Sequence, residues 1–327
     1  MSETRLALGE HLSLPYGVKD VLGAELARRR RLERVLEQCF EETGCTPIQT
    51  PTFEHYEVFA RGASPQALRR AYRFSDGGED LVLRPDPTSA VARVAATTLR
   101  DEPLPLRLAY VCPVFRREEP HGGHFREFHQ AGVEWLGECG PDPEVAVLDL
   151  VLRCLERVGV SRALVQLGSS SVSRALFGAR LEGPNGQRLL MALDRRSAPA
   201  LEELARDGVL DRTSLRDART LLDLSGGAEV FEAARELGGY AAARGALDHL
   251  ELVFRSLPAS RARIDLCATL SMEYYTGLIF RVYAPGQGFE LGRGGRYDRL
   301  LARFGRDLPA VGFGLEIERL LPVAHMP

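Results

Sequence analysis

Polar side chains gather between residues 116 and 134, next to residues whose pattern is typical of β-strands. Arg116 and Glu118 precede a loop. Gln130, Gly132 and Glu134 follow it at a spacing of two, which places them on one face of a strand. Gly132 has no side chain and leaves room for a ligand between the two polar groups. Such a face is costly to bury without a polar ligand, which favours a binding site. The alternative is a sheet face that is exposed to solvent and carries ordinary ion pairs.

Two further segments could supply partners for that face. Asp86 and Thr88 stand at a turn that is stiffened by prolines, where they could contact a ligand or simply cap a helix. Tyr274 and Tyr275 lie close to Gly277, and rings with polar tips can line a site or belong to the core. The residues themselves leave both alternatives open.

Two common site motifs are missing from the sequence. The glycine-rich stretch 292–298 has neither G-x-G-x-x-G nor the Walker lysine, so it favours close approach of the backbone to a ligand over a phosphate loop. The six cysteines are scattered and none has C-x-x-C spacing. We therefore expect buried free thiols and no metal site.

The bulk composition excludes several classes of protein. The 327 residues carry a formal net charge of −3, which weighs against a generally basic nucleic-acid binder. No stretch approaches the ~20 apolar residues that a transmembrane helix needs, and the first ten residues contain no apolar run typical of a signal peptide. We expect a cytoplasmic protein that binds neither nucleic acid nor membrane and requires no cofactor.

Hydrophobic periodicity indicates the elements that must position these residues. We expect helices at about 24–43 and 144–158, with Gly44 ending the first, and a last helix after Gly312. The run 168–171 is typical of a turn. The expected strands cover residues 80–84, 106–115, 128–136, 163–167, 264–270, 274–283 and 289–292.

The middle of the chain differs from both ends. From about residue 172 to 260, Leu, Ala, Arg and Glu dominate, with helical periods separated by Gly or Pro. Strands, a helical block and strands again predict an α+β fold. We expect a core made of residues 1–171 and 261–327, with a helical insertion at 172–260.

Several of these segments, taken in order, resemble class II aminoacyl-tRNA synthetases. Residues 44–54, 115–130 and 312–319 resemble the three motifs of that class, the first of which forms the dimer interface. Residues 83–86, 273–275 and 294–298 are similar to elements specific to the histidine enzyme. The resemblance covers about residues 12–325. It implies an antiparallel sheet flanked by helices, and a dimer.

The resemblance also implies that a pocket for free histidine is retained. Asp86 would hold the α-ammonium group, Arg116 would pair with the α-carboxylate, and Glu134 would accept a hydrogen bond from the imidazole N–H. Charge-assisted hydrogen bonds are worth about 1.5–3 kcal/mol each, so a few suffice for micromolar binding. The expected histidine-binding residues are Asp86, Thr88, Arg116, Gln130, Glu134, Tyr274, Tyr275 and Tyr297.

Catalysis, by contrast, is expected to be lost. Leu270 stands where the synthetases have a catalytic arginine, and the loss of such a donor costs on the order of 100- to 1000-fold in rate. Glu316 replaces a glycine and would repel phosphate, while His124 replaces another arginine. Because Arg116 and Arg319 remain, we expect a nucleotide site that is degraded but not erased.

The chain ends directly after the third motif, so we expect the anticodon-binding domain of the histidine enzyme to be absent. A core with these departures resembles the regulatory subunits of short-form ATP phosphoribosyltransferase. That resemblance implies assembly with separate catalytic subunits, commonly as a hetero-octamer that contains dimers of this chain. It also implies activation of those subunits and feedback inhibition by free histidine, for which a coupling of ~1–3 kcal/mol is enough.

Two other functions stay open. One is a histidine-activating ligase, or half of a split synthetase, without the anticodon-binding domain. It would exchange pyrophosphate into ATP in the presence of histidine. The other is a binding module with no link to histidine synthesis, which would not copurify with a short catalytic subunit.

Overall fold

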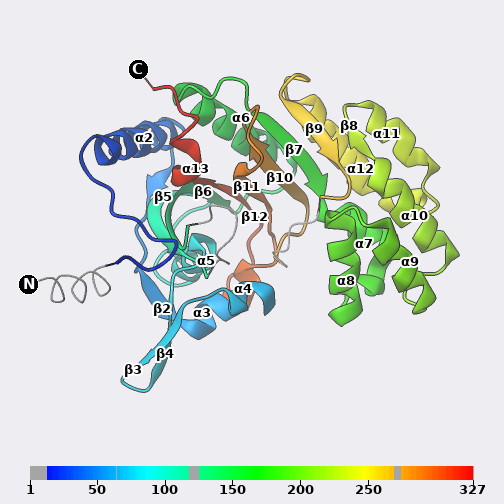
Figure 1. Cartoon of the computed structure of the whole chain (residues 1–327), viewed down its shortest axis with the longest axis horizontal. Helices are drawn as coiled ribbons and strands as arrows, with labels where there is room; N and C mark the ends of the chain where they lie inside the picture. The colour runs from blue at the N-terminus through cyan, green and yellow to red at the C-terminus, as the bar shows by residue number, and fades with distance from the viewer. Residues whose placement is uncertain (1–12, 64, 118–124, 269–273, 327) are drawn as a thin grey trace, which may run out of the picture.

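The computed structural model describes residues 13–63, 65–117, 125–268 and 274–326, and its centre is a nine-stranded sheet (Figure 1). In spatial order the strands are β1 (Thr46–Pro47), β5 (Leu106–Phe115), β6 (Glu127–Leu136), β12 (Ala310–Glu316), β11 (Glu290–Arg296), β10 (Leu278–Tyr283), β7 (Leu164–Ser169), β9 (Ala262–Asp265) and β8 (Ser225–Gly226). Two pairings, β1 with β5 and β7 with β9, are parallel, and the others are antiparallel. The predicted α+β fold with an antiparallel core is confirmed.

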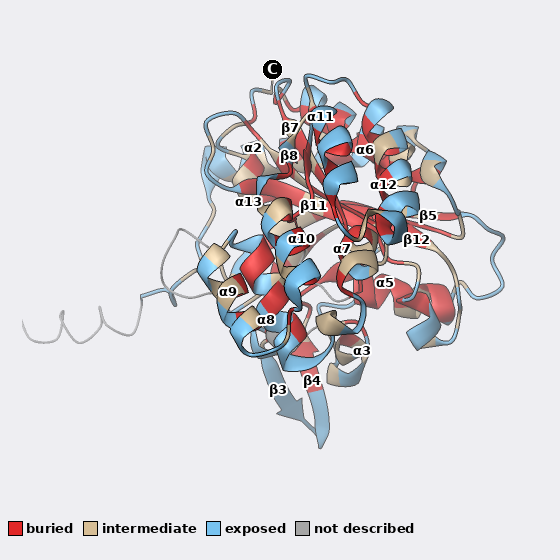
Figure 2. Ribbon diagram, turned by 90° about the vertical axis from the view of Figure 1, so that its right-hand side faces the viewer, coloured by how far each residue is buried: buried red, intermediate tan, exposed pale blue. Residues whose placement is uncertain are grey.

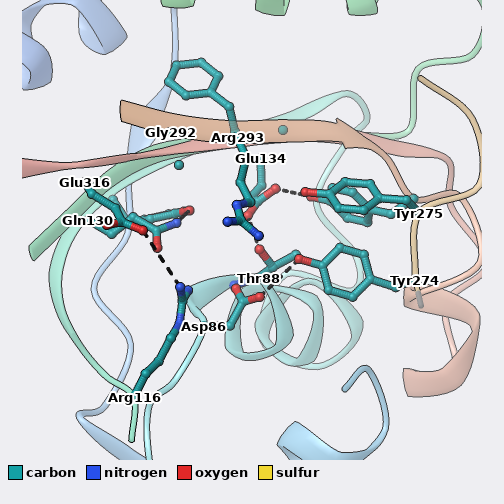
Figure 3. A pocket seen from close by; sticks show the side chains of 15 residues that line it. Asp86, Thr88, Arg116, Gln130, Glu134, Tyr274, Tyr275, Gly292, Arg293 and Glu316 are labelled. Atoms are coloured by element: carbon teal, nitrogen blue, oxygen red, sulfur yellow. Dashed lines mark hydrogen bonds and ion pairs between the residues drawn. The ribbon is translucent and has the colours of Figure 1, made fainter. Parts of the chain in front are cut away.

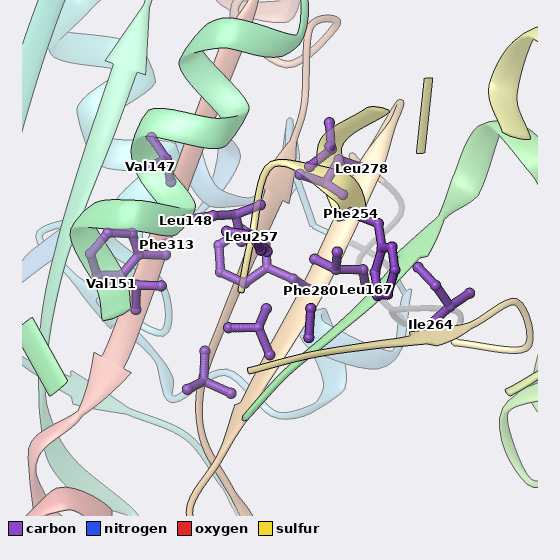
Figure 4. Packing of buried hydrophobic residues seen from close by; sticks show 14 of the residues in the cluster. Val147, Leu148, Val151, Leu167, Phe254, Leu257, Ile264, Leu278, Phe280 and Phe313 are labelled. Atoms are coloured by element: carbon purple, nitrogen blue, oxygen red, sulfur yellow. The ribbon is translucent and has the colours of Figure 1, made fainter. Parts of the chain in front are cut away.

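Two long helices cover one face of this sheet. They are α2 (Gly23–Glu42) and α6 (Pro141–Arg157), both close to their predicted bounds. Leu32, Leu36 and Phe40 of α2 pack with Val133 of β6 and Phe313 of β12 in one buried cluster. Figure 4 shows the neighbouring part of the cluster, where α6 meets the strands. Burying one such side chain fully contributes about 1.5–3 kcal/mol, so this layer fixes the sheet in place.

The opposite face of the sheet carries α5 (Pro87–Ala96) and the 3-10 helix η3 (Leu301–Phe304). Val91 and Ala95, which follow the first turn of α5, pack in one buried cluster with Leu108 of β5. Next to α5 lies a small sheet with the short helices α3 (Tyr56–Ala60) and α4 (Pro65–Arg69). Its strands, in spatial order, are β2 (Phe53–His55), β4 (Glu79–Leu83) and β3 (Arg73–Asp76).

Helices dominate the middle of the chain and lie together at one side of the sheet (Figure 1). Buried residues gather where these helices meet one another and the strands, while their outer faces are exposed (Figure 2). The hydrophobic cluster under α2 and α6 runs on into this block, so the division into core and insertion stays a prediction. The elements are α7 (Ser170–Phe177), η1 (Gly178–Leu181), α8 (Gly183–Asp194), α9 (Ala198–Arg206), α10 (Arg212–Asp223), α11 (Glu229–Ala233), η2 (Ala234–Glu236) and α12 (Tyr240–Arg255).

Several local predictions were wrong, among them the strand at 264–270, since β9 ends at Asp265. The serine run 168–171 is not a turn, because β7 continues to Ser169 and α7 begins at Ser170. Residues after Gly312 form β12 before the four-residue helix α13 (Ile317–Leu320), because Val311, Phe313 and Leu315 alternate into the core. The strand expected at 289–292 is longer, because the glycine-rich stretch continues β11 to Arg296 and is hydrogen-bonded to β10 and β12.

The described residues contain no helix that is both long and apolar enough to cross a membrane. They also contain no group of three or more His, Cys, Asp or Glu side chains placed to hold a metal ion.

Candidate functional site

A cavity opens between the sheet and the N-terminal end of α5, with about 450 Å³ of space not filled by protein atoms, part of it open to solvent. Its floor is made by β6 and β12, which pair so that Gly312 faces Glu134 and Gly314 lies next to Gly132. A Cβ atom added at Gly312 would overlap the carboxylate of Glu134, and one at Gly314 would overlap the amide of Gln130. The glycines of β12 therefore let the two polar side chains of β6 lie across the floor.

Glu134 lies at the bottom of the cavity and is only 2% exposed. Its carboxylate accepts hydrogen bonds from the Thr88 hydroxyl at 2.6 Å and from the Tyr297 hydroxyl. Burial raises the pKa of Glu134 to about 8, and the charge of Asp86 acts in the same direction, although the two hydrogen bonds oppose the rise. The interpretation of this strand as a solvated face was therefore wrong.

Asp86 caps a helix, as one of its two alternatives predicted, and its side chain also faces the cavity. Its side chain caps α5 by accepting a hydrogen bond from the backbone N–H of Thr88 at 2.8 Å. Its other carboxylate oxygen accepts a hydrogen bond from the Tyr274 hydroxyl at 3.1 Å, inside the cavity. The residue is 7% exposed, so the cap also delivers a carboxylate to the pocket.

Three tyrosine rings form one wall of the cavity. The ring centres of Tyr274 and Tyr275 lie 4.9 Å apart, and those of Tyr274 and Tyr297 lie 5.6 Å apart. Burial, followed by the charge of Asp86, raises the pKa of both Tyr274 and Tyr275. Burial and the charge of Glu134 raise the pKa of Tyr297 as well, so all three hydroxyls are neutral at physiological pH and can donate or accept hydrogen bonds.

A fourth tyrosine, Tyr110, was not identified from the sequence. It lies on β5 opposite Gly132 of β6, and its hydroxyl occupies the space above that glycine. The hydroxyl accepts a hydrogen bond from the Gln130 amide at 3.1 Å. Aligning the two predicted strands would have paired Tyr110 with Gly132, but the register could not be fixed from the residues alone.

At the open end of the cavity, Glu316 lies among arginines (Figure 3). The Arg319 guanidinium lies 2.6 Å from its carboxylate, and that of Arg116 lies 3.9 Å away. Burial raises the pKa of Glu316, against the effect of both arginines. Arg116 also donates a hydrogen bond from Nε to the backbone oxygen of Pro85 at 2.8 Å. Both arginines of the predicted nucleotide site are thus paired within the protein.

Arg293 is the second pocket residue that the sequence did not reveal. It lies on β11, four residues before Tyr297, and both side chains line the same cavity. Its guanidinium donates a hydrogen bond to Glu290, a nearly buried carboxylate of the same strand. The expected strand ended at residue 292, one position before Arg293, whereas β11 continues to Arg296.

The structure brings most of the predicted site residues together. The cavity is lined by all eight expected histidine-binding residues and by Glu316, and Arg319 lies next to it through its ion pair with Glu316. Leu270 and His124 fall outside the described residues, as does Glu118. Whether these residues bind histidine stays a prediction, because geometry alone assigns no ligand.

Known proteins are similar to this chain along almost its whole length. Residues 17–320 match the family model described as histidyl-tRNA synthetase. The chain is 39% identical over 316 residues to the ATP phosphoribosyltransferase regulatory subunit of Moorella thermoacetica, covering 95% of this chain and 81% of that protein. It is 32% identical over 317 residues to the protein of the same name from Bacillus subtilis, with the same shares covered.

Solved structures agree with these relatives. The crystal structure of an ATP phosphoribosyltransferase regulatory subunit/histidyl-tRNA synthetase from Bacillus halodurans is similar, with a TM-score of 0.85 and 30% identity, and covers 96% of this chain and 83% of that one. A histidine–tRNA ligase subunit from Alicyclobacillus acidocaldarius has a TM-score of 0.79 and 28% identity, over 95% and 96% of the two chains. This chain therefore belongs to the family of ATP phosphoribosyltransferase regulatory subunits, which has the fold of class II histidyl-tRNA synthetases.

Proposed function

We propose that this chain is the non-catalytic regulatory subunit of a short-form ATP phosphoribosyltransferase, required for its activity and for its feedback inhibition by histidine. Relatives from Moorella thermoacetica and Bacillus subtilis carry the name of regulatory subunit of that enzyme. Free histidine is the effector, and the separate catalytic subunit is the partner. The effector must bind one state of the complex better than another, since a ligand shifts an equilibrium only by its differential affinity.

The observation that carries this proposal is the contrast between the two ends of one cavity. At the closed end, Asp86 and Glu134 are buried carboxylates that can receive the ammonium group and the imidazole N–H of histidine. At the open end, the carboxylate of Glu316 lies between Arg116 and Arg319. A nucleotide phosphate would have to displace that carboxylate and overcome its repulsion, so the pocket favours binding of the amino acid over its activation.

The proposal includes an assembly in the cytoplasm, without nucleic acid or membrane. We place a dimer of this chain within a hetero-octamer, because β1 forms an edge of the main sheet and both of its residues are exposed. An edge strand offers backbone groups and side chains to another chain.

The decisive experiment combines this protein with a short-form catalytic subunit and measures phosphoribosyl transfer with and without histidine. We expect activity only in the mixture, and inhibition of that activity by micromolar histidine. A mixture whose rate equals that of the catalytic subunit alone contradicts the proposal. Pyrophosphate exchange into ATP at a synthetase-like rate would support the alternative, an active histidine-activating ligase.

A variant separates effector binding from assembly. Glu134→Gln keeps the shape of the side chain but removes its charge, so we expect histidine inhibition to weaken by about 10-fold or more while complex formation is unchanged. The matched control is Glu156→Gln on the exposed side of α6, where the half-exposed glutamate pairs with Arg261 outside the pocket. Equal loss of inhibition and assembly in Glu134→Gln would remove Glu134 from the proposed role.

A further inference from the structure

The pocket contains one charged residue to which the proposed function gives no role. Arg293 descends from β11 among the labelled side chains of the cavity (Figure 3). Arg293 and Tyr297 both line the cavity, so Arg293 points to the same side of the sheet as Tyr297. Arginine is expensive to place in a partly closed cavity, and it needs a counter-charge there.

The charges of the pocket are separated into two halves. Within the described ranges, no ion pair joins Asp86 or Glu134 to a basic side chain, so the closed half is acidic. The other half contains both arginines of the cavity lining, Arg116 and Arg293, within a network of ion pairs that extends beyond the cavity. The network consists of Arg116, Arg281, Arg293 and Arg319 with Asp194, Glu290 and Glu316.

This separation matches the charges of a free amino acid. A zwitterion carries an ammonium group, which needs an acidic partner, and a carboxylate, which needs a basic one. The acidic half offers Asp86 to the ammonium group, and the other half offers the guanidinium groups of Arg116 and Arg293 to the carboxylate. A zwitterion that bridges the two halves gives each half a partner of opposite charge. An amine without a carboxylate gives such a partner to the acidic half alone.

Two arginines line the cavity and could receive the carboxylate, and their surroundings differ. Arg116 lies under Glu316, with Nε engaged by Pro85 and its guanidinium 5.1 Å from the ring of Phe128. Arg293 lines the cavity from β11 and points among its labelled side chains (Figure 3), and its charge lowers the pKa of the Tyr275 hydroxyl, which burial and the charge of Asp86 raise. The hydroxyl of Tyr275 is therefore within electrostatic reach of both Arg293 and the carboxylate expected to bind the ammonium group.

We propose that Arg293, and not Arg116, binds the α-carboxylate of the effector, so that this pocket accepts amino acids and rejects the corresponding amines and amino alcohols. This inference rests on the proposed function. It assigns to β11 a guanidinium group that contacts the ligand from the sheet side, opposite the Asp86 cap on α5. It makes Arg293 a specificity-determining residue, with no part in assembly.

The test compares L-histidine with L-histidinol, in which a hydroxymethyl group replaces the carboxylate, by calorimetric titration of the purified protein. We expect the unmodified protein to bind histidine about 10-fold or more tightly than histidinol, since one charge-assisted hydrogen bond is lost. Arg293→Gln should abolish this preference by weakening histidine alone, and Arg293→Lys should restore part of it. Arg116→Gln should keep the preference.

Each other outcome decides against the inference in a distinct way. An Arg293→Gln protein that keeps the preference, or that loses both ligands equally, overturns the assignment and leaves the proposed function standing. Loss of the preference in Arg116→Gln transfers the role to Arg116. An unmodified protein that binds neither ligand contradicts the proposed function itself. Urea unfolding of each variant verifies that the fold is intact.

Discussion

Glu134 has the most unusual environment of the pocket residues. It is an acidic side chain deep in the molecule, held by two hydroxyl donors and placed near a second carboxylate. Hydroxyl groups satisfy its hydrogen-bonding capacity but do not neutralise its charge. The empty pocket therefore holds a carboxyl group that is largely protonated at neutral pH and that a ligand N–H can bring back to the charged form.

This environment predicts a pH dependence of stability. The pKa of Glu134 is raised from 4.5 to about 8, so the folded state binds a proton more tightly than the unfolded state between these values. Stability should therefore fall as pH rises through this interval, by at most about 1.4 kcal/mol per pH unit. Glu134→Gln should flatten the curve of urea midpoint against pH between 5.5 and 8. The control Glu156→Gln should follow the unmodified protein, and parallel curves for all three would contradict the assignment.

At the scale of elements, the pocket depends on how β12 lies against β6. The pairing places Gly312 and Gly314 beneath polar side chains of the neighbouring strand, so that the floor is made of backbone. Phe313 and Leu315 alternate with these glycines and are buried in the core cluster on the other face. One strand thus anchors the sheet and makes space for a ligand.

A methyl group on that floor should damage the pocket more than the fold. In Gly314→Ala the new Cβ would overlap only the flexible side chain of Gln130 among its nearest neighbours, so Gln130 must move. We expect histidine affinity to fall on the order of 10-fold, with a stability loss within the ~0.5–3 kcal/mol typical of single substitutions. Calorimetric titration and urea unfolding measure the two effects.

The matched control is Gly245→Ala on the exposed face of α12. No atom lies within 4 Å of a Cβ added there, so the substitution should stabilise the helix by about 0.5–1 kcal/mol. Histidine affinity should be unchanged. If Gly314→Ala binds histidine as tightly as this control, the floor does not contact the ligand.

At the scale of the whole molecule, a buried charge cluster joins the pocket strand to the helical block. Glu144 of α6 is fully buried and pairs with Arg296 of β11 and with His249 of α12, the latter at 2.7 Å. Arg296 precedes Tyr297, whose hydroxyl binds Glu134. The cluster and the continuous hydrophobic core therefore link the pocket to α12 through direct contacts.

This link should make stability sensitive to the protonation of one histidine. The hydrogen bond with Glu144 raises the pKa of His249 above 6.5. The stabilisation is therefore fully present below pH 6.5 and is lost as pH rises through the raised value. His249→Gln should lower the urea midpoint at pH 6 and have a smaller effect at pH 9. The control His55→Gln, at an exposed position of β2, should change neither value, and an equal effect of His249→Gln at both pH values would contradict the pair.

The sequence by itself determined the main elements and eight of the residues that line the pocket. The period of α2 and the alternation of β5 and β6 are strong local signals, and both elements lie close to their expected bounds. Gln130 and Glu134 stood out because they share one face of a strand, and Asp86 stood out because it lies at a turn stiffened by prolines. The order of several motifs indicated the family, which no single motif could do.

Only the tertiary structure decided how those residues meet. Asp86 and Glu134 are far apart in sequence, and the distance between them depends on strand register, which the local sequence does not encode. Gly312 and the stretch 292–298 were misread because glycine lowers the strand signal, while neighbouring strands supply the hydrogen bonds that keep the segment extended. For the same reason Tyr110 and Arg293 were identified only in the assembled sheet, where side chains of separate strands converge on one cavity.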